Sequence, residues 1–137
     1  DDVVHLWWSS VEAHRAHRLA NTAFEFVYTD SAKSVKMAEE ALAICPACPE
    51  ARNVLAFCAS TLEGALEHYT VGAADCLTRP TANTADSIVK DLSKSGDYWR
   101  VVSLRPYQRA LQGKALTLVK LERWQEALEA YELLMKR

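Results

Sequence analysis

Residues 104–137 read LRPYQRALQGKALTLVKLERWQEALEAYELLMKR, and this stretch decides the fold. It carries two amphipathic helical patterns with a break near Glu122 and Arg123. Small residues alternate with large ones, so two antiparallel helices can approach closely at the small positions and interlock at the large ones. The small positions are Ala115 and Ala127, and the large ones are Leu111, Leu118, Trp124 and Tyr131. The spacing predicts a helical hairpin with Trp124 in its core.

A hairpin with apolar residues on both outer flanks must bury them against another hairpin, which makes it a repeat unit rather than a domain. We therefore expect the rest of the chain to supply stacked neighbours. At the last rung of such a stack, Leu128, Leu133 and Leu134 are expected to leave apolar surface exposed.

The composition fits one ordered helical domain over residues 1–137. Half of the residues are hydrophobic, with only 4 glycines and 4 prolines. The net charge of -2 gives no bulk attraction to nucleic acid. No apolar run approaches the ~20 residues that a membrane-spanning helix needs. We expect an all-α domain of about seven helices stacked as antiparallel pairs, with no cofactor.

The chain start and the cysteines bear on the compartment. The first residues, DDVVHLWW, lack both the basic start and the apolar core of a signal peptide, and no initiating Met precedes them. We expect a processed or excised piece. Four cysteines are too few for a disulfide scaffold, which favours free thiols in a reducing compartment, the cytoplasm or an organelle interior.

The first two thirds of the chain predict a series of short helices. Residues 3–28 follow helical spacing, and we favour one helix that bends near Asn21. Asp30 lies in a good N-cap cluster for a second helix, which Pro46 stops before Pro49 opens a third. Thr61 is expected to cap the next helix. Residues 78–97 are irregular, with a short helix over 85–92, and such a long connection is usually functional or mobile.

The spacing resembles the tetratricopeptide repeat, a helix-turn-helix unit of about 34 residues. The last hairpin matches it at Ala115, Leu118, Trp124, Ala127, Tyr131 and Leu134. The end of an earlier repeat is matched at Ala41, Leu42, Ile44 and Pro46. The next repeat is matched at Leu55 and Ala56, and its second helix at Ala65 and Tyr69 if the turn between its helices is about three residues shorter than standard. The YW and RPYQRAL segments are similar to the suppressor-of-tumorigenicity group of tetratricopeptide-like proteins, which has no agreed activity. The resemblance implies a short right-handed superhelix that binds proteins.

The pair Cys45 and Cys48 is the main candidate for chemistry. A CxxC spacing can form half of a zinc site or a redox pair. The other cysteines are single, and Cys45 falls at a helix C-terminus, where the dipole opposes a thiolate. Only Cys48, near the next helix start, is favourably placed. We interpret both as structural thiols and keep a thiol- or metal-dependent regulatory protein as an alternative.

Other chemical motifs are weak. His14 and His17 share a helix face and could hold a metal, although their setting beside Arg15 and Arg18 is more typical of a solvated face. The sequence has no Gly-rich phosphate loop, no GxSxG and no HExxH. We therefore expect no catalytic residues and no metal site.

We expect a protein-binding scaffold or a structural subunit of a larger assembly. Trp7 and Trp8 are adjacent, so they point about 100° apart on a helix, and one is a candidate partner contact. The tetratricopeptide resemblance places a mixed groove on the inner helices without the full clamp that grips acidic tails. Its expected residues, with one apolar position on the last helix, are Asn53, Arg109, Gln112, Leu116, Lys120 and Leu133. A third hypothesis is self-association through the last hairpin or the Trp7 helix.

Overall fold

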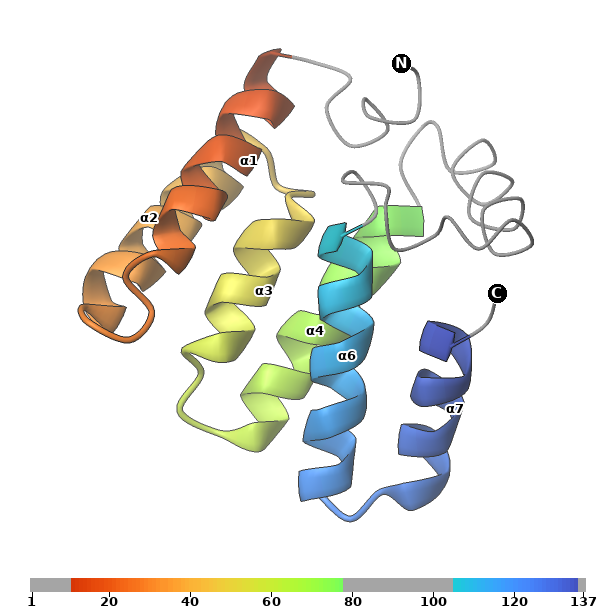
Figure 1. Cartoon of the computed structure of the whole chain (residues 1–137). Helices are drawn as coiled ribbons and strands as arrows, with labels where there is room; N and C mark the ends of the chain where they lie inside the picture. The colour runs from red at the N-terminus through yellow and green to blue at the C-terminus, as the bar shows by residue number, and fades with distance from the viewer. Residues whose placement is uncertain (1–10, 78–104, 136–137) are drawn as a thin grey trace.

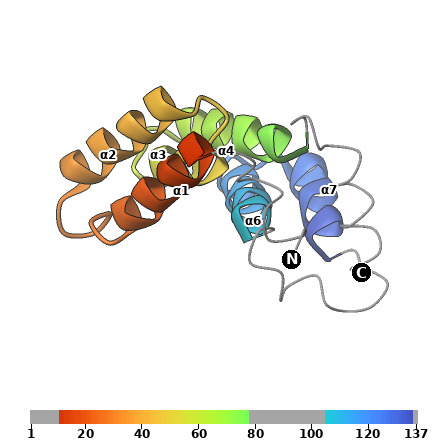
Figure 2. The same cartoon turned by 90° about the horizontal axis from the view of Figure 1, so that it is seen from above.

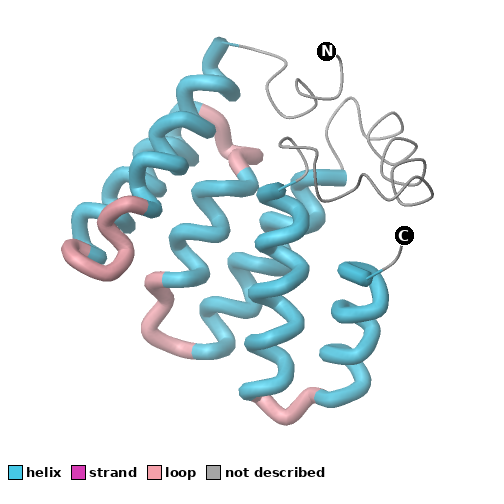
Figure 3. Tube along the Cα trace, viewed as in Figure 1, coloured by secondary structure: helices cyan, strands magenta, loops and turns pink. Residues whose placement is uncertain are grey.

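The computed structural model describes residues 11–77 and 105–135, and these ranges fold into six α-helices without a strand (Figures 1 and 3). The all-α prediction is confirmed for this part of the chain. The helix expected over 85–92 and the irregular segment 78–97 lie outside the described residues. The helices are α1 (Val11–Phe24), α2 (Ser31–Ile44), α3 (Pro49–Phe57), α4 (Leu62–Leu77), α6 (Arg105–Lys120) and α7 (Trp124–Met135).

Successive helices pack in a regular order. The pairs α1 with α2, α3 with α4 and α6 with α7 pack closely, and α4 packs at least as extensively against α6. Helix α3 also packs against α1 and α2, and α6 packs against α3 and α4. Seen from above, α2 and α4 lie along one edge of the molecule, and α1 and α6 lie along the other (Figure 2). Each added pair thus covers the exposed side of the pair before it.

The helix boundaries follow the capping signals in the sequence. The Asp30 carboxylate accepts a hydrogen bond of 3.1 Å from the Lys33 backbone N–H, which confirms the predicted N-cap of α2. Pro49 is the first residue of α3, as expected for proline. The Thr61 hydroxyl accepts from the Gly64 N–H at 3.0 Å and caps α4. Local chemistry therefore fixes where these three helices begin.

The first helix is shorter than predicted. Helix α1 is continuous through Asn21 but ends at Phe24, and residues 25–29 form turns. The Asp30 N–H bonds to the Phe26 carbonyl at 2.8 Å, which closes the turn before α2. The expected extension to residue 28 was wrong because the chain must reverse here to lay α2 along α1, and the expected start at residue 3 lies outside the described residues.

The N-terminal core is built mainly from alanine. Small side chains let α1, α2 and α3 approach closely, and larger apolar residues such as Leu19 and Met37 pack at the margins. The Ser34 hydroxyl donates to the Ala23 carbonyl at 2.8 Å across the α1–α2 contact, so this buried hydroxyl is satisfied. The buried members of the core are Ala16, Ala20, Ala23, Ala38, Ala41, Cys48, Ala51 and Val54.

The C-terminal hairpin forms as predicted, with two differences in its packing. Its turn passes through Glu122, whose φ of 58° lets the chain reverse between α6 and α7. Leu118 is buried and Tyr131 packs against the core of the hairpin. The buried residues of this cluster are Ala115, Leu118, Ala127 and Ala130.

Trp124 is 60% exposed, so its assignment to the core of the hairpin was wrong. It is the first residue of α7, and helical side chains tilt toward the N-terminus of their helix. At this position the side chain is mostly exposed and is not part of the buried cluster between α6 and α7. Leu134 was expected at the surface but is buried, because it continues the face of Ala127 and Ala130 that packs on α6.

Candidate binding groove

A hollow of about 310 Å³ lies where α1, α3, α4 and α6 meet. Four of the residues predicted for partner contact are brought together there. These are Asn53, Arg109, Gln112 and Leu116, and the remaining lining residues are Phe24, Phe57, Tyr69 and Gly113. Because the set combines aromatic and aliphatic surface with amides and one guanidinium, it has the mixed character expected from the sequence.

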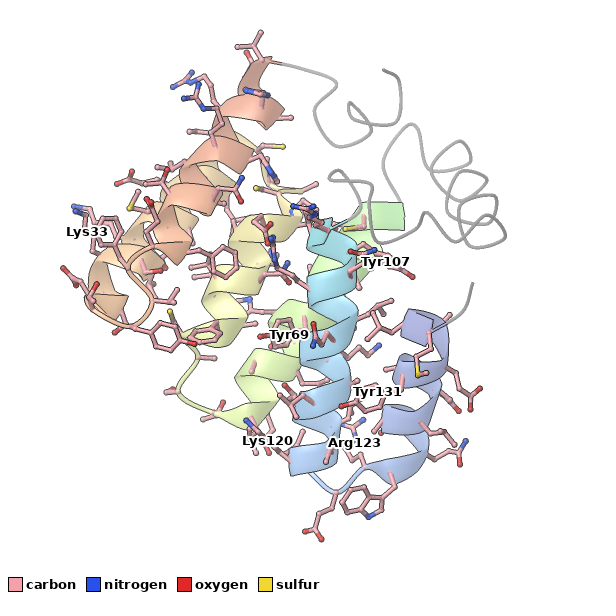
Figure 4. The ribbon with its side chains drawn as sticks, in the orientation of Figure 1. Lys33, Tyr69, Tyr107, Lys120, Arg123 and Tyr131 are labelled. Atoms are coloured by element: carbon pink, nitrogen blue, oxygen red, sulfur yellow. The ribbon has the colours of Figure 1, made fainter. Side chains whose placement is uncertain are left out.

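A second hollow of about 380 Å³ continues from the first along α6. The two share Phe57, Tyr69, Gly113 and Leu116, and the second extends to Thr61 and Lys120. We call the combined surface the α6 groove. Because the two hollows adjoin along one helix, the surface suits an extended segment better than a compact ligand. In Figure 4, Tyr69 and Lys120 mark its middle and its far end.

The remaining predicted partner residues are elsewhere. Leu133 lies on α7 and is 52% exposed, next to exposed Leu128 and Met135. These three residues line a separate hollow of about 630 Å³ with Tyr131, Glu129 and Glu132. The expected apolar surface on α7 is thus present at Leu128 and Leu133. Trp7 and Trp8 lie outside the described residues.

The middle of the α6 groove depends on a glycine. A Cβ atom at position 113 would lie 2.7 Å from Tyr69 Cε2 and closer still to Cζ and Cε1. Only glycine allows the ring to rest on the backbone of α6. Burial raises the pKa of the Tyr69 phenol.

A polar network joins α3 to α6 beneath the groove. The Arg109 guanidinium donates to Glu50 and forms an ion pair with it. Glu50 is only 1% exposed, whereas the Arg109 side chain is 46% exposed. Asn53 Nδ2 donates to Glu50 Oε1 and to the Pro106 carbonyl, each at 3.0 Å. The buried carboxylate is therefore both paired and hydrogen-bonded, as a buried charge requires.

Arg109 also reaches α1. Its guanidinium carbon lies 5.6 Å from the centroid of the Phe24 ring, within the range of a cation–π contact. Burial, and to a smaller extent the charges of Arg109 and His14, lower the pKa of His17 to about 4. His17 is buried and neutral near pH 7, so its placement on a solvated face was wrong. It lies on the face of α1 that also buries Ala13, Ala16 and Ala20, whereas His14 is exposed.

Asn53 leaves one polar atom unused. Both partners of its Nδ2 are oxygen acceptors, so this orientation of the amide is the one that satisfies them. Its Oδ1 is buried and accepts no hydrogen bond from any described residue. A buried acceptor without a donor is costly in a folded protein, by about 1–3 kcal/mol. Asn53 therefore lines the groove while its Oδ1 remains a buried acceptor without a donor.

The cysteine pair has a different character from a redox site. Cys48 lies at the start of α3, as predicted, and is its N-cap residue, but it is buried, and burial raises its pKa to about 11. Hydrogen bonds from the Ala51 and Glu50 N–H groups act in the opposite direction and are outweighed. All four cysteines are free thiols. Within residues 11–77 and 105–135, no three His, Cys, Asp or Glu side chains cluster as a metal site would require.

Three aromatic residues of the groove, and Glu50 beneath it, were not predicted from the sequence. Phe57 is 46% exposed at the end of α3, and an exposed aromatic on an inner helix was a usable signal. Phe24 and Tyr69 come from helices that the spacing did not assign to the groove. Glu50 follows a proline in the first turn of a helix, a position that is typical of a solvated acid. It is buried because α6 packs against α3.

Comparison with known proteins gives no assignment: no family model matches the chain, and neither a curated protein nor a solved structure matches it. Among the described helices, none combines the length and the apolar character needed to cross a bilayer.

Proposed function

We propose that this chain is a tetratricopeptide-like helical repeat module that binds an extended segment of a partner protein in the α6 groove. The observation that carries the proposal is the groove itself. It places exposed Phe57 and Leu116, from α3 and α6, beside the polar groups of Gln112 and Arg109. Apolar anchors with a few polar groups beside them are typical of peptide-binding surfaces.

The order of helix contacts supports the repeat character. Within a stack of hairpins, the first helix of each pair contacts both helices of the preceding pair. Helix α3 has this relation to α1 and α2, and α6 has it to α3 and α4. The first helices of the three pairs, α1, α3 and α6, all contribute residues to the groove. Helical repeats build a continuous binding face from the first helices of successive pairs, and this similarity supports the proposal, although Tyr69 of α4 lines the groove as well.

The test is selection of short displayed peptides on the chain, followed by affinity measurement. Leu116→Ser removes an apolar contact of the groove at a side chain that is 48% exposed, so the fold should tolerate it. Leu128→Ser is the matched control, because Leu128 is 51% exposed on α7, outside the groove. We expect L116S to weaken the selected peptides at least about tenfold and L128S to leave them unchanged. No enrichment, or equal loss in both variants, would contradict the proposal.

Self-association is a second candidate, favoured by the exposed apolar face of α7. Leu128, Leu133 and Met135 are 51%, 52% and 72% exposed. They lie together on one helix, and grouped apolar residues at a surface point to an interaction site more than single ones do. Light scattering at two concentrations tests it. A molar mass that rises with concentration and falls back in L133S supports pairing through α7, and a constant monomer mass contradicts it.

A further inference from the structure

We infer that the α6 groove selects an uncharged segment, in which an apolar side chain is flanked by a hydrogen-bond donor, and rejects acidic segments. The inference rests on the proposed function and specifies its ligand. Three features of the groove carry it: a cation that is already neutralised, a buried acceptor that lacks a donor, and a surround of aromatic and aliphatic side chains.

The charge balance of the groove is the first feature. Among the described residues that line it, the cations are Arg109, at the inner end, and Lys120, at the far end of the second hollow. Arg109 is paired with Glu50, which is almost fully buried. An acidic ligand that drew the guanidinium away would leave a buried carboxylate unpaired, which is strongly unfavourable. The buried Glu50 carboxylate therefore holds Arg109 and offsets much of the charge that a ligand would meet.

The unsatisfied buried acceptor of Asn53 is the second feature. Asn53 is only 2% exposed, lines the groove and has a buried Oδ1 that no described donor satisfies. A ligand carboxylate has only acceptors and cannot meet this atom, whereas a backbone N–H or a side-chain amide can. The exposed Gln112 amide, which also lines the groove, can both donate and accept. The Asn53 acceptor and the Gln112 amide thus match the N–H donor and the carbonyl acceptor of an extended peptide backbone.

The apolar surround is the third feature. Phe24, Phe57, Tyr69 and Leu116 approach from α1, α3, α4 and α6, so apolar surface faces the hollow from four helices. The hollow exposes much more apolar than charged side chain, which favours a leucine-, methionine- or phenylalanine-sized residue of the ligand. Such a residue would anchor the segment, while the amides beside it set its register.

The experiment uses the full chain and peptides selected on it from a random displayed library. We expect the enriched peptides to share an apolar residue flanked by Asn, Gln or other neutral positions. Replacing the flanking neutral residues of a selected peptide by Asp should weaken it at least about tenfold. Binding of the neutral peptide should change less than about twofold between low and high salt, since no net charge is paired.

Two variants test the role of the ion pair. Glu50→Gln frees Arg109 and should strengthen the Asp-substituted peptide about tenfold relative to the wild-type chain. The double variant E50Q/R109Q removes both charges and should lose that gain. Circular dichroism confirms that each variant is folded before its affinity is compared.

The outcomes separate the inference from the proposed function. Enrichment of acidic peptides whose binding falls with salt and is lost in R109Q and in E50Q/R109Q would overturn the inference and leave peptide binding standing. Enrichment of neutral peptides that L116S does not weaken would place their site elsewhere and overturn it too. No enrichment of any class would overturn the proposed function and this inference together.

Discussion

The ring of Tyr69 lies directly on the backbone of Gly113, a contact between α4 and α6 that has no room for a Cβ atom. The same two residues line both hollows of the α6 groove. The close approach therefore serves two purposes: it packs the second helix pair against the third, and it forms the floor of the proposed binding surface.

Gly113→Ala should destabilise the chain, although alanine favours a helix by about 1 kcal/mol over glycine. The added methyl group overlaps three atoms of the Tyr69 ring, and overpacking of this kind costs about 1–3 kcal/mol. Urea denaturation measures the free energy of unfolding. In the background Tyr69→Ala, the overlap is gone, so G113A should become neutral or stabilising. The same loss in both backgrounds would show that the ring is not what excludes the methyl group.

The ion pair between Arg109 and Glu50 should matter more than a surface pair. Arg109→Gln leaves a buried carboxylate without its cation, and we expect a loss of about 1–3 kcal/mol, limited by the remaining Asn53 hydrogen bond and by the half-exposed guanidinium. The double variant E50Q/R109Q should recover part of that loss. Chemical denaturation of the two single variants and the double variant gives the coupling free energy between the residues. A coupling near zero would contradict the pairing.

Stability should fall as the pH drops below neutrality because of His17. Its pKa is 6.5 in the unfolded chain and about 4 in the folded one, so between these values the unfolded chain binds the proton preferentially. Well above pH 6.5 the His17 imidazole is neutral in both the folded and the unfolded chain, so it causes no loss of stability there. We expect urea denaturation to lose about 1–3 kcal/mol between about pH 7.5 and pH 5.

The variant His17→Gln should flatten this pH dependence. His68 acts in the same direction, since burial and the Arg52 charge lower its pKa, but it is less buried than His17. His68→Gln is therefore the comparison: it should remove a smaller part of the slope. If H17Q leaves the slope unchanged, the protonation that weakens the fold occurs elsewhere.

Cys48 should resist alkylation in the folded chain. The thiolate is the reactive form, and burial raises the pKa of this thiol to about 11. Iodoacetamide labelling followed by mass spectrometry should modify partly exposed Cys45 and Cys58 first, with buried Cys48 and Cys76 reacting only on unfolding. Rapid labelling of Cys48, or zinc found by elemental analysis and lost in C48S, would instead support the thiol- or metal-dependent alternative.

Much of the fold could be predicted because its signals are local. The cap at Asp30, the cap at Thr61 and the first-turn proline at Pro49 each act within one helical turn, and all three were read correctly. The break at Glu122 is equally local. The tetratricopeptide resemblance, in contrast, is what assigned Arg109 and its neighbours on α6 to one surface.

The rest depends on contacts between distant parts of the chain. The carboxylate of Glu50 is buried by α6, and Tyr69 contacts Gly113 from a different helix. Neither contact can be predicted from the spacing of neighbouring residues. His17 was read as solvated because polar neighbours surround it in sequence, yet it shares a helix face with buried alanines. Periodicity assigns a face to a residue but does not tell what covers that face.

Trp124 gives the clearest test of this distinction. It matches the repeat spacing, yet its position at the first turn of α7 leaves it 60% exposed, so Trp124→Ser should cost less than about 1 kcal/mol. Leu118 is 1% exposed in the α6–α7 core, and Leu118→Ala should cost about 2–5 kcal/mol. Thermal or urea unfolding of both variants compares them directly. If W124S proved as damaging as L118A, the indole would have to be covered, either by a second copy or by part of the chain beyond the described residues.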